Sequence, residues 1–361
     1  MQFVRRHQLW ALAALTAWTH AAQGQAYDPD WARNFRVGML VGFNINADFK
    51  MSGSAFPISG SNPGPIGQRG KDHFYDDGYV RVDSTGNGNP DSVDAAANGG
   101  FTTYWSYQNS SQISGQTLQF HSSSTFATSA PNAQRDDTPY VGFELAYGGN
   151  LGYWRQFRFG WEVGFGLLPI SITDSRPLSA SVVQSTYSFK IPSAVTVVPG
   201  PPPYYGPYNG NSGAASIYDI ATLAGSTNLA NQPLTGSRTL DVNLYAFRLG
   251  PSVFWDVSPY IGISASAGPA LGIVSGDYKY DETIVTPNGP VRNKGRFDDT
   301  EIVYGGYVSA TVTYHAVEKG DIYLGAQFMP LGDATFSKGG RSAKLNLGGA
   351  VFISAGINWP F

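Results

Sequence analysis

Apolar and polar residues alternate with a period of two in eight stretches of this chain. In FRVGMLVGFNINADF, residues 35–49, one face carries Phe35, Val37, Met39, Val41, Phe43, Ile45 and Phe49. Charged, polar and glycine residues occupy most of the other face. The same pattern recurs at residues 139–150, 154–168, 245–257, 260–274, 301–315, 321–329 and 348–361. Alternation of this kind predicts β-strands with one apolar and one polar face.

The connections between these stretches alternate in length, and this predicts the topology. Long segments at 50–137, 172–239 and 277–299 alternate with short ones, and 330–344 forms the last connection. Each strand approaches the ~9–11 residues that a tilted strand needs to cross a bilayer. We therefore expect an all-β fold: a closed up-and-down antiparallel transmembrane β-barrel of eight strands, with long extracellular loops and both termini in the periplasm.

The two longest segments leave the strand count open between eight and ten to twelve. Residues 101–122 contain two alternating runs around SSQISG, which predict a hairpin. We place this hairpin outside the barrel because its runs are short and carry Ser, Thr and Gln on both faces. The run SVVQSTYSFKI at 181–191 could add strands in the same way. The Pro-, Gly- and Tyr-rich residues 192–213 predict an extended loop.

Composition narrows the class of protein. The net charge of −3 and the absence of a basic run give nucleic-acid binding no support. Charged residues make up only 14% of the chain, aromatic residues also 14%, and there are 44 glycines. No apolar run after residue 26 is long enough for a spanning helix. The chain has no cysteine, which excludes disulfides, zinc-thiolate sites and a thiol nucleophile.

Residues 1–26 have the features of a secretory signal peptide. Arg5 and Arg6 precede a short apolar core, and small residues follow at cleavage-type spacing near Ala22, Gly24 and Ala26. We expect residues 27–361 to form the mature barrel in a bacterial outer membrane.

Five charged residues lie on the polar face of the predicted strands: Arg36, Glu144, Arg158, Glu162 and Arg248. In an eight-stranded barrel the interior is filled by side chains, so these charges must pair with one another. The sequence predicts a structural charge network in the lumen. A narrow ion path along the same charges is the alternative.

Aromatic residues gather near predicted strand ends and suggest interfacial belts. The candidates are Trp154, Trp255, Tyr260, Tyr314, Trp359 and Phe361.

The segment DSTGNGNPDSVD has the spacing of a calcium loop. Its ligand positions would be Asp83, Thr85, Asn87, Asp91 and Asp94, with Gly88 at the sharp turn. Asp stands where a bidentate Glu is usual, and an ordinary turn has the same composition. We therefore expect no cofactor, with calcium as the alternative.

Catalysis has little support in the sequence. After the signal peptide only His73, His121 and His315 remain, and Asp72, Asp76 and Asp77 lie near the first two. No spacing specifies a catalytic triad or dyad. We expect a protein that is not an enzyme.

The eight alternating stretches and the terminal ISAGINWPF resemble small bacterial outer-membrane β-barrels of the OmpA/OmpX/OmpW type. The resemblance implies contact with outer-membrane lipid and recognition of Phe361 by the barrel-assembly machinery. Two departures stand out: the first two loops are unusually long, and no peptidoglycan-binding domain follows the last strand. We expect a structural or surface-interaction role through the loops and an unknown extracellular ligand. A small passive channel is the alternative.

Overall fold

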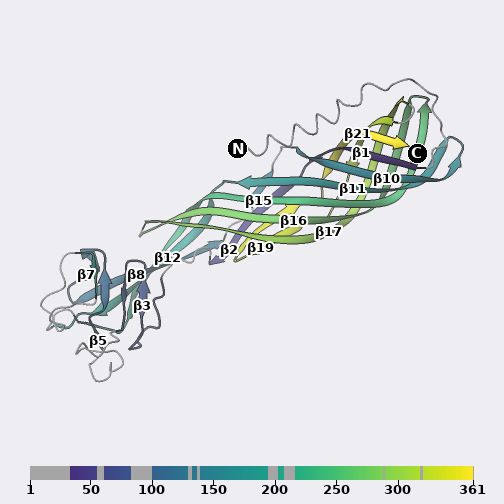
Figure 1. Cartoon of the computed structure of the whole chain (residues 1–361). Coiled ribbons are helices and arrows are strands. Elements are labelled where there is room, and N and C mark those ends of the chain that lie inside the picture. The colour runs from purple at the N-terminus through teal and green to yellow at the C-terminus, as the bar shows by residue number, and fades with distance from the viewer. Residues whose placement is uncertain are drawn as a thin grey trace.

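The computed structural model describes residues 33–54, 61–82, 100–128, 132–135, 139–193, 202–206, 216–287, 289–317 and 320–360. The predicted signal peptide lies outside these residues. The described chain forms an elongated molecule with a ring of long strands at one end and a small knob at the other (Figure 1). No helix among the described residues is long and apolar enough to cross a membrane.

Eight strands pair antiparallel in a closed ring. In ring order they are β1 (Arg33–Phe43), β10 (Tyr140–Trp154), β11 (Phe157–Asp174), β15 (Thr222–Ser258), β16 (Ile261–Thr286), β17 (Gly289–Val317), β18 (Gly320–Phe328) and β21 (Val351–Pro360). β21 then pairs with β1, so that Val37 lies opposite both Leu145 and Ile357. These are the eight stretches in which the sequence alternates.

The all-β, antiparallel prediction is confirmed, but the sheet as a whole is larger than eight strands. It contains 15 strands. The additional ones are β2 (Asn46–Ser54), β7 (Ile113–Ser114), β8 (Thr117–Thr128), β9 (Asn132–Arg135), β12 (Leu178–Lys190), β19 (Ala334–Lys338) and β20 (Arg341–Asn346). Most of them come from the segments between the expected strands, where Ser- and Thr-rich runs alternate weakly and give little strand signal. β2 begins inside the expected strand 35–49, and β8 begins inside the expected hairpin 101–122.

The two faces of the ring differ in polarity. The outward positions of β1 are apolar and exposed, with Val37 at 45% and Met39 at 53%, whereas Arg36 between them is 5% exposed. The other seven strands repeat this arrangement with the following exposed residues: Val141, Phe143, Phe159, Val163, Phe247, Leu249, Ile261, Ile263, Ile302, Val308, Val312, Ile322, Leu324, Ile353 and Ile357. The ring therefore presents its apolar face to the outside and encloses its charged face.

The expected 35–49 strand is broken after Phe43. Asn44 has a positive φ of 58°, and its side-chain Nδ2 donates to the Gly349 carbonyl at 2.8 Å. The break lets the chain leave the ring and pair with β20 instead. It also reverses the faces, so Ile45 and Phe49, which we placed on the outer face, are buried at 1% and 0% exposure.

A second layer packs inside the long strands beyond the break. β19 and β20 form a hairpin from residues that we expected to be a simple connection, and β20 pairs with β2. Phe336 and Leu345 of the hairpin, with Phe49 of β2, join one apolar core with Val242 and Tyr278 of β15 and β16. This core fills the space between the hairpin and the inner face of the long strands.

The knob has an apolar core of its own. It contains two small sheets: one of β3 (His73–Tyr75), β4 (Gly78–Val80), β6 (Trp105–Tyr107) and β13 (Tyr204–Tyr205), and one of β5 (Phe101–Thr102) and β14 (Ile217–Tyr218). Its core residues include Tyr75, Trp105, Phe120 and Phe189.

A three-stranded ribbon of β8, β12 and the first part of β15 joins this knob to the ring. The expected hairpin at 101–122 is not formed. Its first run becomes β6, which pairs with β4 and β13, and a short 3-10 helix, η3 (Ser110–Gln112), follows. Its second run belongs to β8, which pairs with β12.

Candidate functional site

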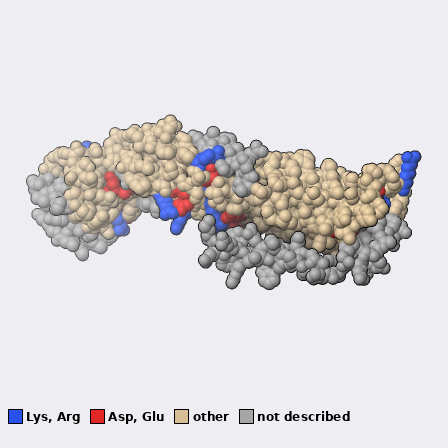
Figure 2. Space-filling model, turned by 90° about the horizontal axis from the view of Figure 1, so that it is seen from above, with Lys and Arg blue, Asp and Glu red and all other residues tan. Residues whose placement is uncertain are grey.

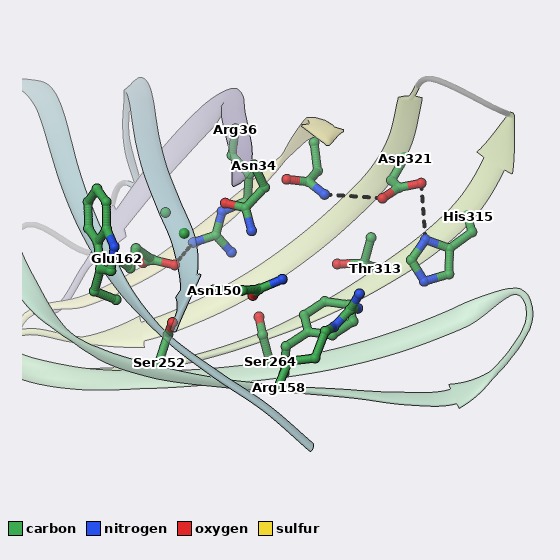
Figure 3. Close-up of a pocket in the computed structure, with 15 residues that line it drawn as sticks. Asn34, Arg36, Asn150, Arg158, Glu162, Ser252, Ser264, Thr313, His315 and Asp321 are labelled. Carbon is green, nitrogen blue, oxygen red and sulfur yellow. Dashed lines mark hydrogen bonds and ion pairs between the residues drawn. The ribbon is translucent and has the colours of Figure 1, made fainter. Parts of the chain in front are cut away.

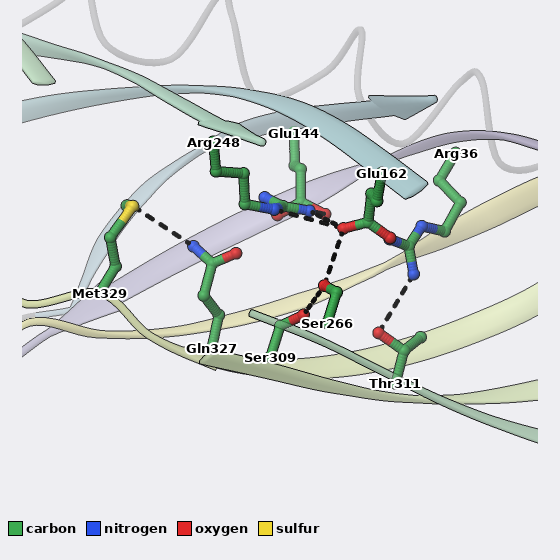
Figure 4. Close-up of polar contacts among 9 residues, drawn as sticks. All are labelled: Arg36, Glu144, Glu162, Arg248, Ser266, Ser309, Thr311, Gln327 and Met329. Carbon is green, nitrogen blue, oxygen red and sulfur yellow. Dashed lines mark hydrogen bonds and ion pairs between the residues drawn. The ribbon is translucent and has the colours of Figure 1, made fainter. Parts of the chain in front are cut away.

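Four of the five predicted interior charges meet in the middle of the ring (Figure 4). The guanidinium of Arg248 donates to Glu144 Oε2 at 3.0 Å and to Glu162 Oε1 at 3.1 Å. Arg36 donates to the other oxygen of Glu162 and, at 3.2 Å, to the Thr311 hydroxyl. We call Arg36, Glu144, Glu162 and Arg248 the charge layer. All four are less than 10% exposed.

Hydroxyl groups and aromatic rings complete this layer. Ser266 donates to Glu162 Oε1 at 3.3 Å, and its hydroxyl contacts that of Ser309 at 2.7 Å. The rings of Tyr323 and Tyr307 lie 5.5 and 5.6 Å from the guanidinium carbons of Arg36 and Arg248. The charges of two cations and two anions thus cancel inside the ring, and each carboxylate accepts at least one hydrogen bond from an arginine. Among the described residues, Arg36 Nε is buried without a hydrogen-bond partner.

Arg158 lies apart from the charge layer, nearer the end of the ring where the short turns are. It contacts Asp256 at 2.9 Å, and its guanidinium carbon lies 4.1 Å from the centre of the Phe254 ring. His315 lies 3.5 Å from Asp256 through Nε2 and 3.1 Å from Asp321 through Nδ1. The prediction of one network of five charges is therefore wrong in its extent.

A small polar cavity lies beside Arg158, His315 and Asp321 (Figure 3). Its volume is about 50 Å³, and its walls include Arg36, Arg158, Glu162, His315 and Asp321. Such a volume holds about three to five water molecules. The cavity borders the charge layer through Arg36 and Glu162. On the opposite side of that layer, the apolar core of the hairpin and the long strands begins.

Sequence reasoning missed Asp256, His315 and Asp321 as interior residues. His315 ends the expected strand 301–315 and Asp321 begins the expected strand 321–329, and neither is among the five charges assigned to the polar face. Their register contains the signal, because His315 lies opposite Asp321 and Asp321 lies opposite Asn358.

A second buried ion cluster, also missed, lies beyond the ring in the second layer. Glu282 is 0% exposed, accepts from Arg238 Nε at 2.5 Å, and pairs with Arg341 of the hairpin at 2.9 Å. The Arg341 guanidinium carbon lies 4.0 Å from the centre of the Tyr280 ring. This cluster ties the hairpin to β15 and β16. The sequence analysis does not predict this cluster, because it places Arg341 in the connection 330–344.

The described belt candidates all lie at one end of the ring. Trp154, Tyr260, Tyr314 and Trp359 are at least 40% exposed. Trp255 of β15 lies opposite Phe157, the first residue of β11 after the β10–β11 turn. Phe361 lies outside the described residues. The residues of the alternative calcium loop, Asp83, Thr85, Asn87, Asp91 and Asp94, lie outside them too.

No family model and no curated protein matches the chain. Similar solved structures include the outer membrane protease OmpT from Escherichia coli, with 11% identity, covering 95% of this chain and 100% of that one at a TM-score of 0.31. The Ail protein of Yersinia pestis is 7% identical over 90% and 99% of the two chains, with a TM-score of 0.24. A Pseudomonas aeruginosa FadL homologue is 9% identical over 91% and 90%, with a TM-score of 0.19. At these scores the likeness carries no argument about this chain.

Proposed function

We propose that this protein is an integral β-barrel of a bacterial outer membrane that holds the knob outside the cell as a surface-interaction module. The observation that carries this proposal is the inverted polarity of the ring. Its outer face is apolar and exposed, while its arginines and glutamates are enclosed. In water such a ring would leave a large apolar surface exposed, which monomeric soluble proteins avoid.

The height of the apolar band supports a membrane. Outward residues stay apolar from Ile261 to Ile273 on β16, a rise of about 40 Å along the strand at about 3.4 Å per residue. On β1 the band runs from Phe35 to Phe43, or about 27 Å. Strands tilted by about 40° reduce these lengths to roughly 20–30 Å, which brackets the ~25 Å apolar band of outer-membrane barrels.

The outward face becomes polar and then charged above this band. Ser275 and Thr300 face each other across β16 and β17, and Asp277 and Asp298 form the next outward pair. Charged side chains accordingly gather in the middle of the molecule, and the wall of the ring beside them shows few (Figure 2). This change supports an assignment of the knob and ribbon to the outside and of the short turns to the periplasm.

The interior favours a scaffold over a conduit. Paired charges occupy the middle of the ring, and the apolar core beyond them includes Phe352 and Leu347 at 0% exposure. The polar cavity reaches this region from one side, and its lining does not include residues of that core. We therefore propose a structural role for the charge layer and no catalytic role for the protein.

Two measurements test the proposal. The purified chain, refolded into phospholipid vesicles, should migrate differently on SDS gels before and after boiling, as folded barrels do. In planar bilayers it should give no steady single-channel current. Failure to insert into vesicles contradicts the membrane assignment. A steady ohmic conductance instead supports the passive channel. A negative protease and hydrolase screen in detergent is expected as well.

A further inference from the structure

The ribbon that carries the knob has two edges, and they differ. β8 forms one edge and β15 the other, with β12 between them. A strand edge presents unpaired N–H and C=O groups, and these can pair with another strand.

The β8 edge is closed by other parts of the chain. Asp77 Oδ1 accepts from the backbone N–H of His121 at 2.8 Å, and Asp76 Oδ2 accepts from that of Ser123 at 2.7 Å. The His121 carbonyl accepts the Asp76 N–H at 2.9 Å. β7 and β2 pair with the two ends of β8.

Within the part of the chain that the structure describes, the β15 edge is open over the same length of the ribbon. β16 pairs with β15 only from Leu234 onward, and before that residue β12 is the single described strand that pairs with β15. Residues 222–228 are all exposed, and Leu223 is 49% exposed. Register shifts at both ends leave Gly225–Leu229 as an uninterrupted run against Val182–Thr186.

The central run of this edge lacks two of the usual protections. Exposed edges normally carry charges or proline, which prevent pairing with another chain. The run GSTNL at 225–229 has neither. When two copies pair antiparallel through the same run, the central residue meets its own copy and every other residue meets another residue of the run. Charges of one sign in the run would therefore repel across the contact. The neutral run imposes no such repulsion.

We propose that Gly225–Leu229 is a homotypic contact at which two copies of this chain pair antiparallel, edge to edge. The ribbon follows the long axis of the molecule (Figure 1). Copies in one membrane share an orientation, so a two-fold axis between them runs along the ribbon and makes equivalent strands parallel. Antiparallel pairing therefore joins copies that point in opposite directions, from two membranes that face each other. This inference rests on the proposed outer-membrane location.

Each edge-to-edge contact is short and weak, so adhesion depends on many such contacts. Five residue pairs make a weak association, but many copies on two facing surfaces act together. The expected activity is thus adhesion between cells that carry the protein.

Disulfide trapping tests the contact, because the natural chain has no cysteine. Thr227 lies at the centre of the run and meets Thr227 of the second copy. The full chain with Thr227→Cys, in two differently tagged populations of phosphatidylethanolamine–phosphatidylglycerol vesicles, should form mixed-tag dimers with a mild oxidant. The matched control is Ser124→Cys, which is exposed on the closed edge of the same ribbon. We expect at least ~5-fold more mixed dimer from Thr227→Cys, together with vesicle clustering.

Charge substitutions test the register. In this pairing Ser226 faces Asn228 of the second copy. Adding Ser226→Lys and Asn228→Lys to Thr227→Cys should abolish mixed dimers, and Ser226→Asp with Asn228→Lys should restore them. Equal trapping at both edges, or dimers only within one vesicle population, overturns the inference.

The two proposals fail differently. A chain that inserts and shifts on heating but does not trap contradicts the contact alone. A chain that traps in detergent but never inserts contradicts the membrane assignment and the facing-membrane arrangement.

Discussion

Removing the carboxylate of Glu162 is the sharpest test of a packed interior. Glu162 accepts hydrogen bonds from both Arg248 and Arg36, and the other hydrogen bond that Arg36 makes with a described residue is to the Thr311 hydroxyl. In Glu162→Gln two buried cations share the single carboxylate of Glu144. Breaking a buried ion pair by removing one partner costs about 3–5 kcal/mol.

Glu144→Gln should cost less, because Arg248 keeps its contact with Glu162. The loss is then near the value of one hydrogen bond to a charged group, about 1.5–3 kcal/mol. The double variant Arg36→Met with Glu162→Leu removes one cation and one anion together. It should lie within about 1–2 kcal/mol of the natural protein, because apolar replacement of a buried pair is often neutral.

Urea unfolding from lipid vesicles, followed by tryptophan fluorescence and by the gel shift on heating, measures these differences. A loss of about 3–5 kcal/mol moves the midpoint of Glu162→Gln by roughly 2 M urea at typical slopes. If Glu162→Gln and Glu144→Gln are equal, and both lie within ~0.5 kcal/mol of the natural protein, water solvates the arginines. That result would refute the packed interior and favour the channel.

Three further perturbations test other parts of the molecule. Leu324→Arg places a charge on the outer face of the ring and should lower the free energy of unfolding in vesicles by about 2–4 kcal/mol. Thr283→Arg lies beyond the apolar band and should lower it by less than ~0.5 kcal/mol. Equal effects would contradict the membrane assignment. Phe336→Ala empties a fully buried site between the hairpin and the long strands, so we expect a loss of about 3–5 kcal/mol and faster proteolysis of the hairpin; an unchanged urea midpoint would contradict that packing. The hydrogen bond to Asp77 raises the pKa of His121 in β8. The protonated His121–Asp77 pair therefore stabilises the folded protein fully below about pH 6.5, and this stabilisation is lost as pH rises through the pKa of the folded state. Thermal melting followed by near-ultraviolet circular dichroism should show this loss in the natural protein and not in Asp77→Asn.

The alternation in the sequence predicted the ring because each position there has only two environments. The pattern placed Arg36 inside and Val37 outside without reference to any partner. The same rule failed at Ile45, because one residue with positive φ, Asn44, shifted the faces. A single backbone conformation of this kind leaves the hydrophobic pattern unchanged and so gives no signal.

The hairpin and the knob could not be predicted in this way. Ala343 and Leu345 alternate over only a few residues, and their burial depends on β2, about 300 positions earlier in the chain. The sequence places Asp76 and Asp77 near a histidine, but it does not show that they also close the β8 edge. Such roles depend on contacts that are distant in sequence, which local periodicity does not contain.

In strand β16 the same alternating pattern continues through two different surroundings. On β16 the outward residues Ile263 and Leu271 are apolar and the inward Ser266 is polar. Further along, the outward Lys279 is charged and the inward Val274 and Tyr278 are buried in the apolar core. The period of two never changes, but the polarity of the faces reverses near residue 274. A uniform aqueous or apolar surrounding gives no reason for such a reversal, because the outer face would keep one character throughout. A boundary between lipid and water that crosses the strand explains this reversal. The interior changes from paired charges to apolar packing at the same height. Below this height the outer face is apolar and the inner face polar, and above it the two faces exchange polarity.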